Sequence, residues 1–230
     1  MRKNMSLEII DDLGSKIVHG IISDGTVLPR VEEYSEQLGV SRTVIREVYL
    51  GLNTKQLVKS VPKIGTVVQP STKWLWWDAD ILSWASAQED SQVFSEINQI
   101  RLMLEPSVCE LAAICATDHE IKAIAEALEI LKQSTYDVNK WAIADLKFHE
   151  LILFSSKNQL LTSLGKLMHK PLLKVRIRLF TELEKSNRPI DFRVHGEILA
   201  ALRSKNGQAA KNNMYTLIKY LNEQLELIEK

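Results

Sequence analysis

The residues of this chain best suited to chemistry are a carboxylate and two imidazoles. Asp145 and His149 are four positions apart, which places both side chains on one face of a helix. Together they form half of a metal site, and His195 could extend the site from a facing helix. A histidine at helical spacing is also compatible with a purely local hydrogen bond. The pattern therefore leaves open a metal site and a purely structural role.

Arg101 is the candidate for holding an anionic group, because a planar guanidinium can pair with both oxygens of a carboxylate. Glu105 lies one turn further along the same predicted helix, so a surface ion pair between the two is the alternative. Two further arginines, Arg176 and Arg178, face opposite sides of their predicted helix. At most one of them therefore lines a pocket.

These side chains lie in a region of helical periodicity. From Val93 onward, apolar residues recur at spacings of three and four, which predicts helices rather than strands. The predicted helices span residues 93–115, 118–133, 138–156, 158–183, 191–204 and 207–229. Residues 93–230 are therefore predicted to form an antiparallel, all-α helical bundle with a ligand pocket between helices.

The N-terminal region has a different pattern, in which short helices alternate with turns. The predicted helices span residues 7–22, 31–38 and 41–53. Gly39 lies in the turn between the second and third, and the apolar face of the third leaves Arg42, Thr43 and Arg46 exposed at its N-terminal end. That end of a recognition helix enters the major groove, where arginine pairs with guanine edges and phosphates.

Two β-branched runs, 58–61 and 66–68, follow the third helix. They predict a β-hairpin, or wing, with Lys63 and Gly65 near its turn. Residues 40–70 carry five basic side chains and one acidic side chain, although the whole chain has 29 of each. Residues 1–70 are therefore predicted to form a winged helix-turn-helix that binds double-stranded DNA.

Residues 71–92 are predicted to be a tryptophan-rich linker. They contain four of the five tryptophans of the chain, Trp74, Trp76, Trp77 and Trp84. Because indole rings bury much area, the sequence favours packing between domains or subunits, with a ligand-stacking cage as the alternative.

Composition excludes several classes of protein. The chain has 230 residues, 45% hydrophobic and 25% charged, with a formal net charge of zero, which is typical of a soluble globular protein rather than a disordered one. Cys109 and Cys115 are too few for a disulfide framework. No apolar run approaches the roughly 20 residues that cross a bilayer, and acids replace the apolar part of a signal peptide. We therefore expect a cytoplasmic protein without membrane association.

The N-terminal motifs together resemble the winged helix-turn-helix of the GntR superfamily of bacterial transcription regulators. The motifs are Leu28-Pro29, the run from Leu38 to Glu47, and Gly65-Thr66-Val67-Val68. The resemblance implies that Arg42 and Arg46 contact operator DNA, assisted by Thr43 and the wing from Lys63 to Gly65. Glu32 departs from the family, which usually has an arginine there, so we expect an operator different from the common family sequence.

The later motifs are similar to the ligand-binding domain of the FadR-like subfamily, and residues 77–84 are similar to the linker of its sugar-acid regulators. The motifs are Arg101 to Pro106, Asp145-x-x-x-His149, Ser156 to Asn158, and His195 with Ile198 to Leu202. They imply an effector site of Arg101, Asp145, His149, Asn158 and His195.

Metal-binding members of that subfamily hold a divalent ion with one Asp and three His, and the ion binds the effector carboxylate. The third of these His positions is Leu217 here, and leucine cannot bind a metal. Two forms of the site follow. Either Asp145, His149 and His195 hold zinc or a similar ion in an open shell completed by effector oxygens or water, or they hydrogen-bond the effector directly.

We therefore expect a homodimeric transcription regulator of mainly α structure. The resemblance implies a repressor of a sugar-acid catabolic operon, released from its operator by an aldonate such as galactonate. One alternative is a metal-dependent hydrolase or lyase acting on a sugar acid, although the chain has no His-Glu-x-x-His motif. The other is a DNA-binding protein whose second domain only dimerises.

Overall fold

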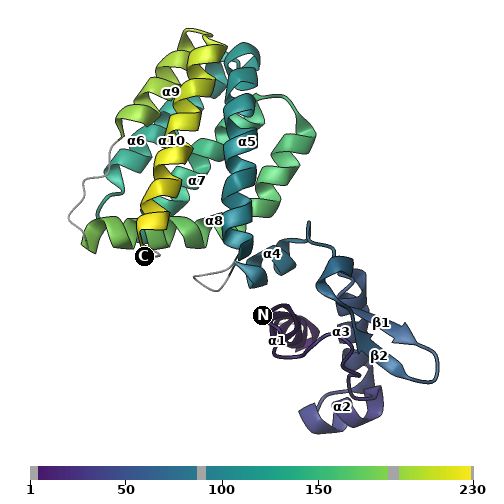
Figure 1. The fold of residues 1–230 in the computed structure, drawn as a ribbon. Coiled ribbons are helices and arrows are strands. Elements are labelled where there is room, and N and C mark those ends of the chain that lie inside the picture. The colour runs from purple at the N-terminus through teal and green to yellow at the C-terminus, as the bar shows by residue number, and fades with distance from the viewer. Residues whose placement is uncertain (1–4, 87–91, 186–191, 229–230) are drawn as a thin grey trace. The chain divides into compact units, whose positions relative to one another are not determined.

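The computed structural model describes residues 5–86, 92–185 and 192–228 of the chain (Figure 1). It divides the chain into two compact units, Met1–Gln88 and Glu89–Lys230. Both units are mainly helical, and the sheet in the described residues has two strands. The predicted fold class, a winged helix-turn-helix followed by a helical bundle, is confirmed.

The N-terminal unit begins with a helix-turn-helix and a hairpin. Its elements are α1 (Met5–Val18), α2 (Val31–Leu38), α3 (Arg42–Thr54), β1 (Val58–Val61) and β2 (Gly65–Val68). Gly39 ends α2 with a φ of 64°, and the Ser41 side chain starts α3 by accepting a hydrogen bond from the Val44 amide. The strands pair antiparallel, with Val61 opposite Gly65.

The first helix is shorter than the sequence predicts. It ends at Val18 rather than at residue 22, because Gly20 adopts a left-handed φ of 72° and breaks the helix there. The apolar residues Ile17, Ile45, Leu52 and Leu57 are at most 1% exposed and form the core of this unit. The core fixes the orientation of α3 and therefore which of its side chains face solvent.

The tryptophan-rich segment folds onto the N-terminal unit. It contains a 3-10 turn, η1 (Ser71–Lys73), and a short helix, α4 (Ala79–Ala85). Trp84 of α4 is buried against Gly14 of α1 and donates its indole N–H to Asp11 over 2.7 Å. This differs from the expected packing between domains or subunits. Residues 87–91 of the predicted linker lie outside the described part of the chain.

The C-terminal unit is a bundle whose helices match the predicted bounds to within two residues at each end. They are α5 (Gln92–Cys115), α6 (Asp118–Gln133), α7 (Val138–Ser155), α8 (Gln159–Lys185), α9 (Arg193–Arg203) and α10 (Gly207–Ile228). Side chains cap the N-terminal ends of α6 and α7 at the positions where the sequence indicates a break between helices. Thr117 and Glu120 form a capping box at α6, and Asp137 caps α7.

The packing of these helices places polar residues inside the bundle. Helix α7 packs against α6, α8 and α5, while α5 packs along α10. Four helices contribute buried charged or imidazole side chains, namely Arg101, Glu105, Asp145, His149, Arg176 and His195. We call these six residues the buried polar cluster.

No helix in the described residues combines the length and apolar character needed to cross a membrane.

Candidate effector site and DNA-binding surface

The side chains predicted to read DNA lie on one exposed surface of the N-terminal unit. Arg42, Thr43 and Arg46 are exposed at the N-terminal end of α3, while Ile45 and Val48 on its opposite face are fully buried. The burial of that face prevents α3 from rotating the two arginines inward. The arrangement matches a recognition helix with a free N-terminal end.

The wing places its predicted residues at the hairpin turn. Lys63 is exposed and has a φ of 65°, and Gly65 has a φ of 127° at the start of β2. A side chain at position 65 would strain this backbone, which explains the glycine. A basic residue that the sequence analysis did not select, Arg30, is exposed at the start of α2. Its neighbour Pro29 accepts a hydrogen bond from Tyr49 of α3 over 2.6 Å.

Inside the bundle, Asp145 is held from two other helices. The Nε of Arg176, on α8, donates to Asp145 Oδ2. His195 Nε2, on α9, lies 3.2 Å from Asp145 Oδ1. These three side chains are at most 4% exposed. Both oxygens of the Asp145 carboxylate are therefore engaged by side chains that are far away in the sequence.

Glu105 organises the other half of the cluster. Its Oε1 accepts a hydrogen bond from Arg101 Nε over 2.6 Å, and its Oε2 lies 2.7 Å from His149 Nδ1. The ion pair of Arg101 with Glu105, an alternative left open by the sequence, is present but lies in the interior rather than at the surface. Glu105 thus orients both a guanidinium and an imidazole that were predicted to contact the effector.

The charges in the cluster set one another's protonation. Burial disfavours the ionised form of Glu105, but Arg101 and His149 outweigh burial and hold its pKa well below the usual range. Burial likewise opposes the ionisation of Asp145, but Arg176, His149 and His195 together outweigh burial, so the pKa of Asp145 is also lowered. For His149 burial prevails and lowers the pKa. A neutral His149 therefore donates Nδ1–H to Glu105 and keeps a lone pair on Nε2.

Several polar atoms of the cluster remain free. Within the described residues, no hydrogen-bond partner is found for Arg101 Nη2, Arg176 Nη1 and Nη2, His149 Nε2 and His195 Nδ1. Leaving such groups buried and unpaired costs free energy, so folded proteins satisfy nearly all of them. The concentration of these donors and imidazole nitrogens in one interior region makes the cluster a candidate site for a polar ligand.

The cluster also contains a set of metal-ligating residues. Ligand atoms of Asp145, His149 and His195 all lie within 4.8 Å of one another, so this buried group could hold a metal ion. Glu105 would then act as the outer partner that orients His149, as carboxylates do in many metal sites. Leu217 on α10, at the position of the missing third His, is only 3% exposed.

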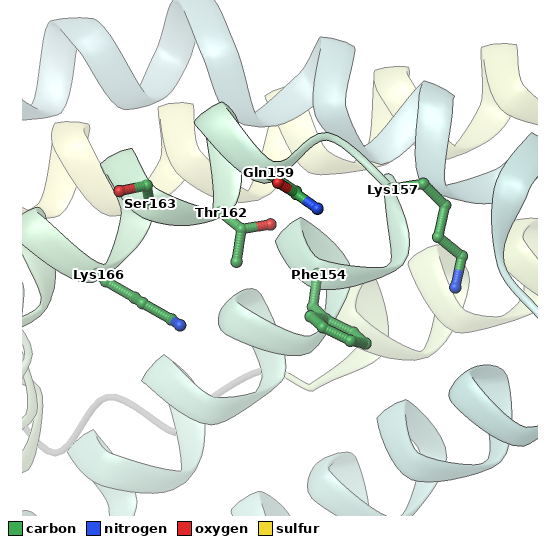
Figure 2. A pocket seen from close by; sticks show the side chains of 6 residues that line it. All are labelled: Phe154, Lys157, Gln159, Thr162, Ser163 and Lys166. Atoms are coloured by element: carbon green, nitrogen blue, oxygen red, sulfur yellow. The ribbon is translucent and has the colours of Figure 1, made fainter.

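Asn158 does not join the cluster. It is exposed, and its side-chain oxygen accepts hydrogen bonds from the amides of Leu160 and Leu161 at the start of α8. Beside it lies a surface pocket of about 420 Å³, shown in Figure 2 and lined by Phe154, Lys157, Gln159, Thr162, Ser163 and Lys166. The structure therefore gives Asn158 a capping role that the resemblance did not indicate.

The sequence alone does not identify two members of the cluster as site residues. It indicates Glu105 only as an ion-pair partner, and it does not decide between Arg176 and Arg178. The contact of Glu105 with His149 joins residues on different helices, and Arg176 is 2% exposed. Spacing along one helix predicts which residues share a face, but not which face of another helix meets it.

Comparison with known proteins agrees with both units. Residues 5–68 match the family model described as bacterial regulatory proteins, gntR family, and residues 96–220 match the FCD domain. The chain is 33% identical over 213 residues to the HTH-type transcriptional regulator YieP of Escherichia coli K12, covering 91% of this chain and 90% of that one. It is 30% identical over 219 residues to the galactonate operon transcriptional repressor of the same strain, covering 95% of each.

Among solved structures, Lar, which controls the expression of the Listeria monocytogenes agr system, has a similar fold. The TM-score is 0.62 at 15% identity, and the match covers 98% of both chains. The family models together cover the helix-turn-helix, the wing and most of the bundle. The chain therefore belongs to the GntR family of bacterial regulatory proteins, with an FCD domain at its C-terminal end, and is a transcription regulator rather than an enzyme.

Proposed function

We propose that this regulator represses a sugar-acid catabolic operon and leaves its operator when a small hydroxy carboxylate, such as an aldonate, binds in the buried polar cluster. It acts in the cytoplasm as a homodimer. The observation that carries the proposal is the set of buried nitrogens on Arg101, Arg176, His149 and His195 that have no hydrogen-bond partner in the described part of the chain. The likeness to the galactonate operon repressor supports an aldonate as the effector.

The cluster nitrogens without a partner in the described residues can bind both the carboxylate and the hydroxyl groups of such a ligand. Guanidinium N–H groups on Arg101 and Arg176 are donors for a carboxylate, and the His149 Nε2 lone pair accepts a hydrogen bond from a hydroxyl group. Asn98 Oδ1 and Trp141 Nε1 are also buried without a partner in the described residues. Asn98 lies one turn before Arg101, and Trp141 one turn before Asp145. They would serve further hydroxyl groups along a polyol chain.

DNA binding is proposed to depend on the exposed end of α3 and on the wing. Arg42 and Arg46 contact bases or phosphates, and Thr43 and the wing residues Lys63 and Gly65 add backbone contacts. Two copies related by a two-fold axis would read a pseudo-palindromic operator with one half-site for each recognition helix.

The types of the donor residues are compatible with two forms of the effector site. In one, a divalent ion such as zinc is held by Asp145, His149 and His195 and binds the effector's oxygens. In the other, the protein side chains hydrogen-bond the acid directly. Both forms predict an acid-responsive regulator, and they differ in whether a chelator removes the response.

Operator binding in the presence of acids tests the proposal. Fluorescence anisotropy would measure binding of the full-length protein to DNA upstream of its own operon, with aldonic, uronic and dicarboxylic acids added in turn. We expect at least one hydroxy acid to release the DNA. Arg101→Ala should still bind the operator but lose the response, because it removes a buried donor of the cluster. If no acid alters either operator binding or the melting temperature of the protein, the alternative in which the second domain only dimerises is favoured.

A further inference from the structure

Arg176 occupies the position in the cluster where a metal ion would need to bind Asp145. Its Nε donates to Asp145 Oδ2, and its side chain is 2% exposed. The other oxygen, Oδ1, is engaged by His195 Nε2. His149 Nε2 lies 3.9 Å from Asp145 Oδ2, too far for a hydrogen bond. The carboxylate is therefore already neutralised by a permanent cation from the protein itself.

This arrangement does not fit a resident divalent ion, although the types of the donor residues do. An ion bound to Asp145 would lie beside the buried guanidinium of Arg176, and like charges repel strongly where water is excluded. It would also have to displace the hydrogen bonds from Arg176 and His195. Arginine does not give up its charge to relieve that repulsion.

We propose that Arg176 is a built-in cation that replaces a metal ion in this site and, together with Arg101, binds the carboxylate of the effector directly. The inference rests on the proposed function, since it assigns the ligand contacts of the same site. Arg176 Nη1 and Nη2 and Arg101 Nη2, which have no partner among the described residues, are the donors available for this role. Nε of each arginine is used to hold a protein carboxylate, which fixes the direction of its outer nitrogens.

Zinc uptake by the full-length protein tests the first half of the inference without any acid. The protein would be dialysed against zinc chloride and gel-filtered to remove weakly bound ions. Its zinc content would then be measured by inductively coupled plasma mass spectrometry. We expect far less than one zinc per chain for the unsubstituted protein, whereas about one tightly held zinc per chain would overturn the inference.

Substitution of Arg176 tests whether its charge is what prevents zinc from binding. Arg176→Gln keeps a hydrogen-bond donor for Asp145 but removes the charge, so zinc retention should rise toward about one ion per chain. Adding His149→Gln to it should abolish the gain. Arg203→Gln, at an exposed site on α9, is the charge-matched control and should not change zinc retention. Should Arg176→Gln fail to fold, the result for the unsubstituted protein decides alone.

Melting of the full-length protein tests the second half. D-galactonate and D-gluconate would be compared with galactitol, which has hydroxyl groups but no carboxylate, each with and without EDTA. We expect an acid to raise Tm equally in both conditions and galactitol to have no effect. An acid-induced shift that EDTA abolishes would overturn the inference but keep the proposed function. The absence of any acid-induced shift, together with no operator release, would contradict the proposed function, while zinc uptake still decides the role of Arg176.

Discussion

Arg101 and Glu105 form an ion pair whose side chains are only 2% and 7% exposed. Removing one member of such a pair leaves a buried charge without its partner, which costs far more than losing a pair at the surface. Glu105 also holds His149 in place, so its charge supports two side chains of the proposed effector site.

Replacing Glu105 by glutamine should therefore destabilise the protein strongly. We expect Glu105→Gln to lower the free energy of unfolding by about 3–5 kcal/mol, measured by urea denaturation of the full-length chain. Glu110→Gln is the control on the same helix, because Glu110 pairs with Lys211 at a partly exposed site. It should cost less than about 1 kcal/mol. Equal losses for both variants would contradict the view that the Glu105 pair is an interior one.

Arg46 is the residue at which DNA recognition can be tested separately from effector binding. Arg46→Ala should weaken operator binding by about 1–3 kcal/mol, with a smaller salt dependence if the contact is to phosphate. The acid-induced shift in melting should be unchanged. Arg203→Ala removes the same charge from the C-terminal unit and is expected to leave DNA affinity unaltered. Joint loss of DNA binding and thermal stability in Arg46→Ala would instead mark a structural role.

The sequence predicts which residues lie together on one helix better than it predicts which residues of different helices contact each other. The spacing of Arg101 with Glu105 and of Asp145 with His149 follows from the helical repeat. The contacts of Asp145 with Arg176 and of Glu105 with His149 depend on how α5, α7 and α8 pack. No local pattern encodes that packing, which is why Arg176 could not be chosen over Arg178 in advance.

Among the elements, α4 shows how a short helix can be fixed by one close contact. A Cβ atom on Gly14 of α1 would lie 2.3 Å from the Trp84 ring of α4, which is closer than atoms can approach. Lys55, the residue directly after α3, makes a second contact by pairing with Asp78 and Asp80 at 2.8 Å. Helix α4 therefore packs onto α1, and its Asp80 forms an ion pair with the residue that follows α3.

Gly14→Ala should disrupt this packing. Because the Trp84 ring would have to move, we expect a loss of about 1–3 kcal/mol in the free energy of unfolding. Gly196→Ala, in α9, is the control, since a Cβ there meets nothing within 4 Å. It should be neutral or stabilise by up to about 1 kcal/mol. Thermal unfolding monitored by tryptophan fluorescence would compare them, and a harmless Gly14→Ala would contradict the close contact.

The Lys55 ion pairs predict a specific pH dependence. Burial lowers the pKa of Lys55, but the hydrogen bonds that Lys55 donates to Asp78 and Asp80, together with the negative charges of these two carboxylates, outweigh burial and raise the pKa above the ordinary 10.5. A raised lysine pKa contributes stability that is complete below the unfolded value and is lost as the pH rises through the folded value. The difference in Tm between the unsubstituted protein and Lys55→Met should therefore stay constant from about pH 6 to 9 and shrink only above about pH 10.5. A difference that shrinks below pH 9 would contradict this pairing.

The sequence predicts long helices well because their ends carry strong local signals, such as the Thr117 and Glu120 capping box. Helix α4 was missed because seven residues show too little periodicity to be separated from a linker. Its position depends on Gly14, which the helical pattern of residues 7–22 does not distinguish from its neighbours. The function of that glycine becomes visible only when α1 and α4 are seen together.

The whole molecule consists of two compact units, one matching the gntR family model and one matching the FCD domain. If the acid weakens operator binding, the operator must weaken acid binding by the same factor, because the coupling free energy between two sites is reciprocal. This requirement holds whatever the path of coupling between the units. It also separates a true effector from a compound that only stabilises the protein.

Coupling between acid and operator is tested most directly by titrating the protein with D-galactonate, with and without a saturating operator duplex. Operator titrations at zero and at saturating acid would be run in parallel. Coupling free energies between two allosteric sites are typically about 1–3 kcal/mol, so we predict that each ligand weakens the binding of the other by the same factor of about 5–150. Equal acid affinity in the presence and absence of operator, or operator affinity that does not respond to acid, would contradict the account.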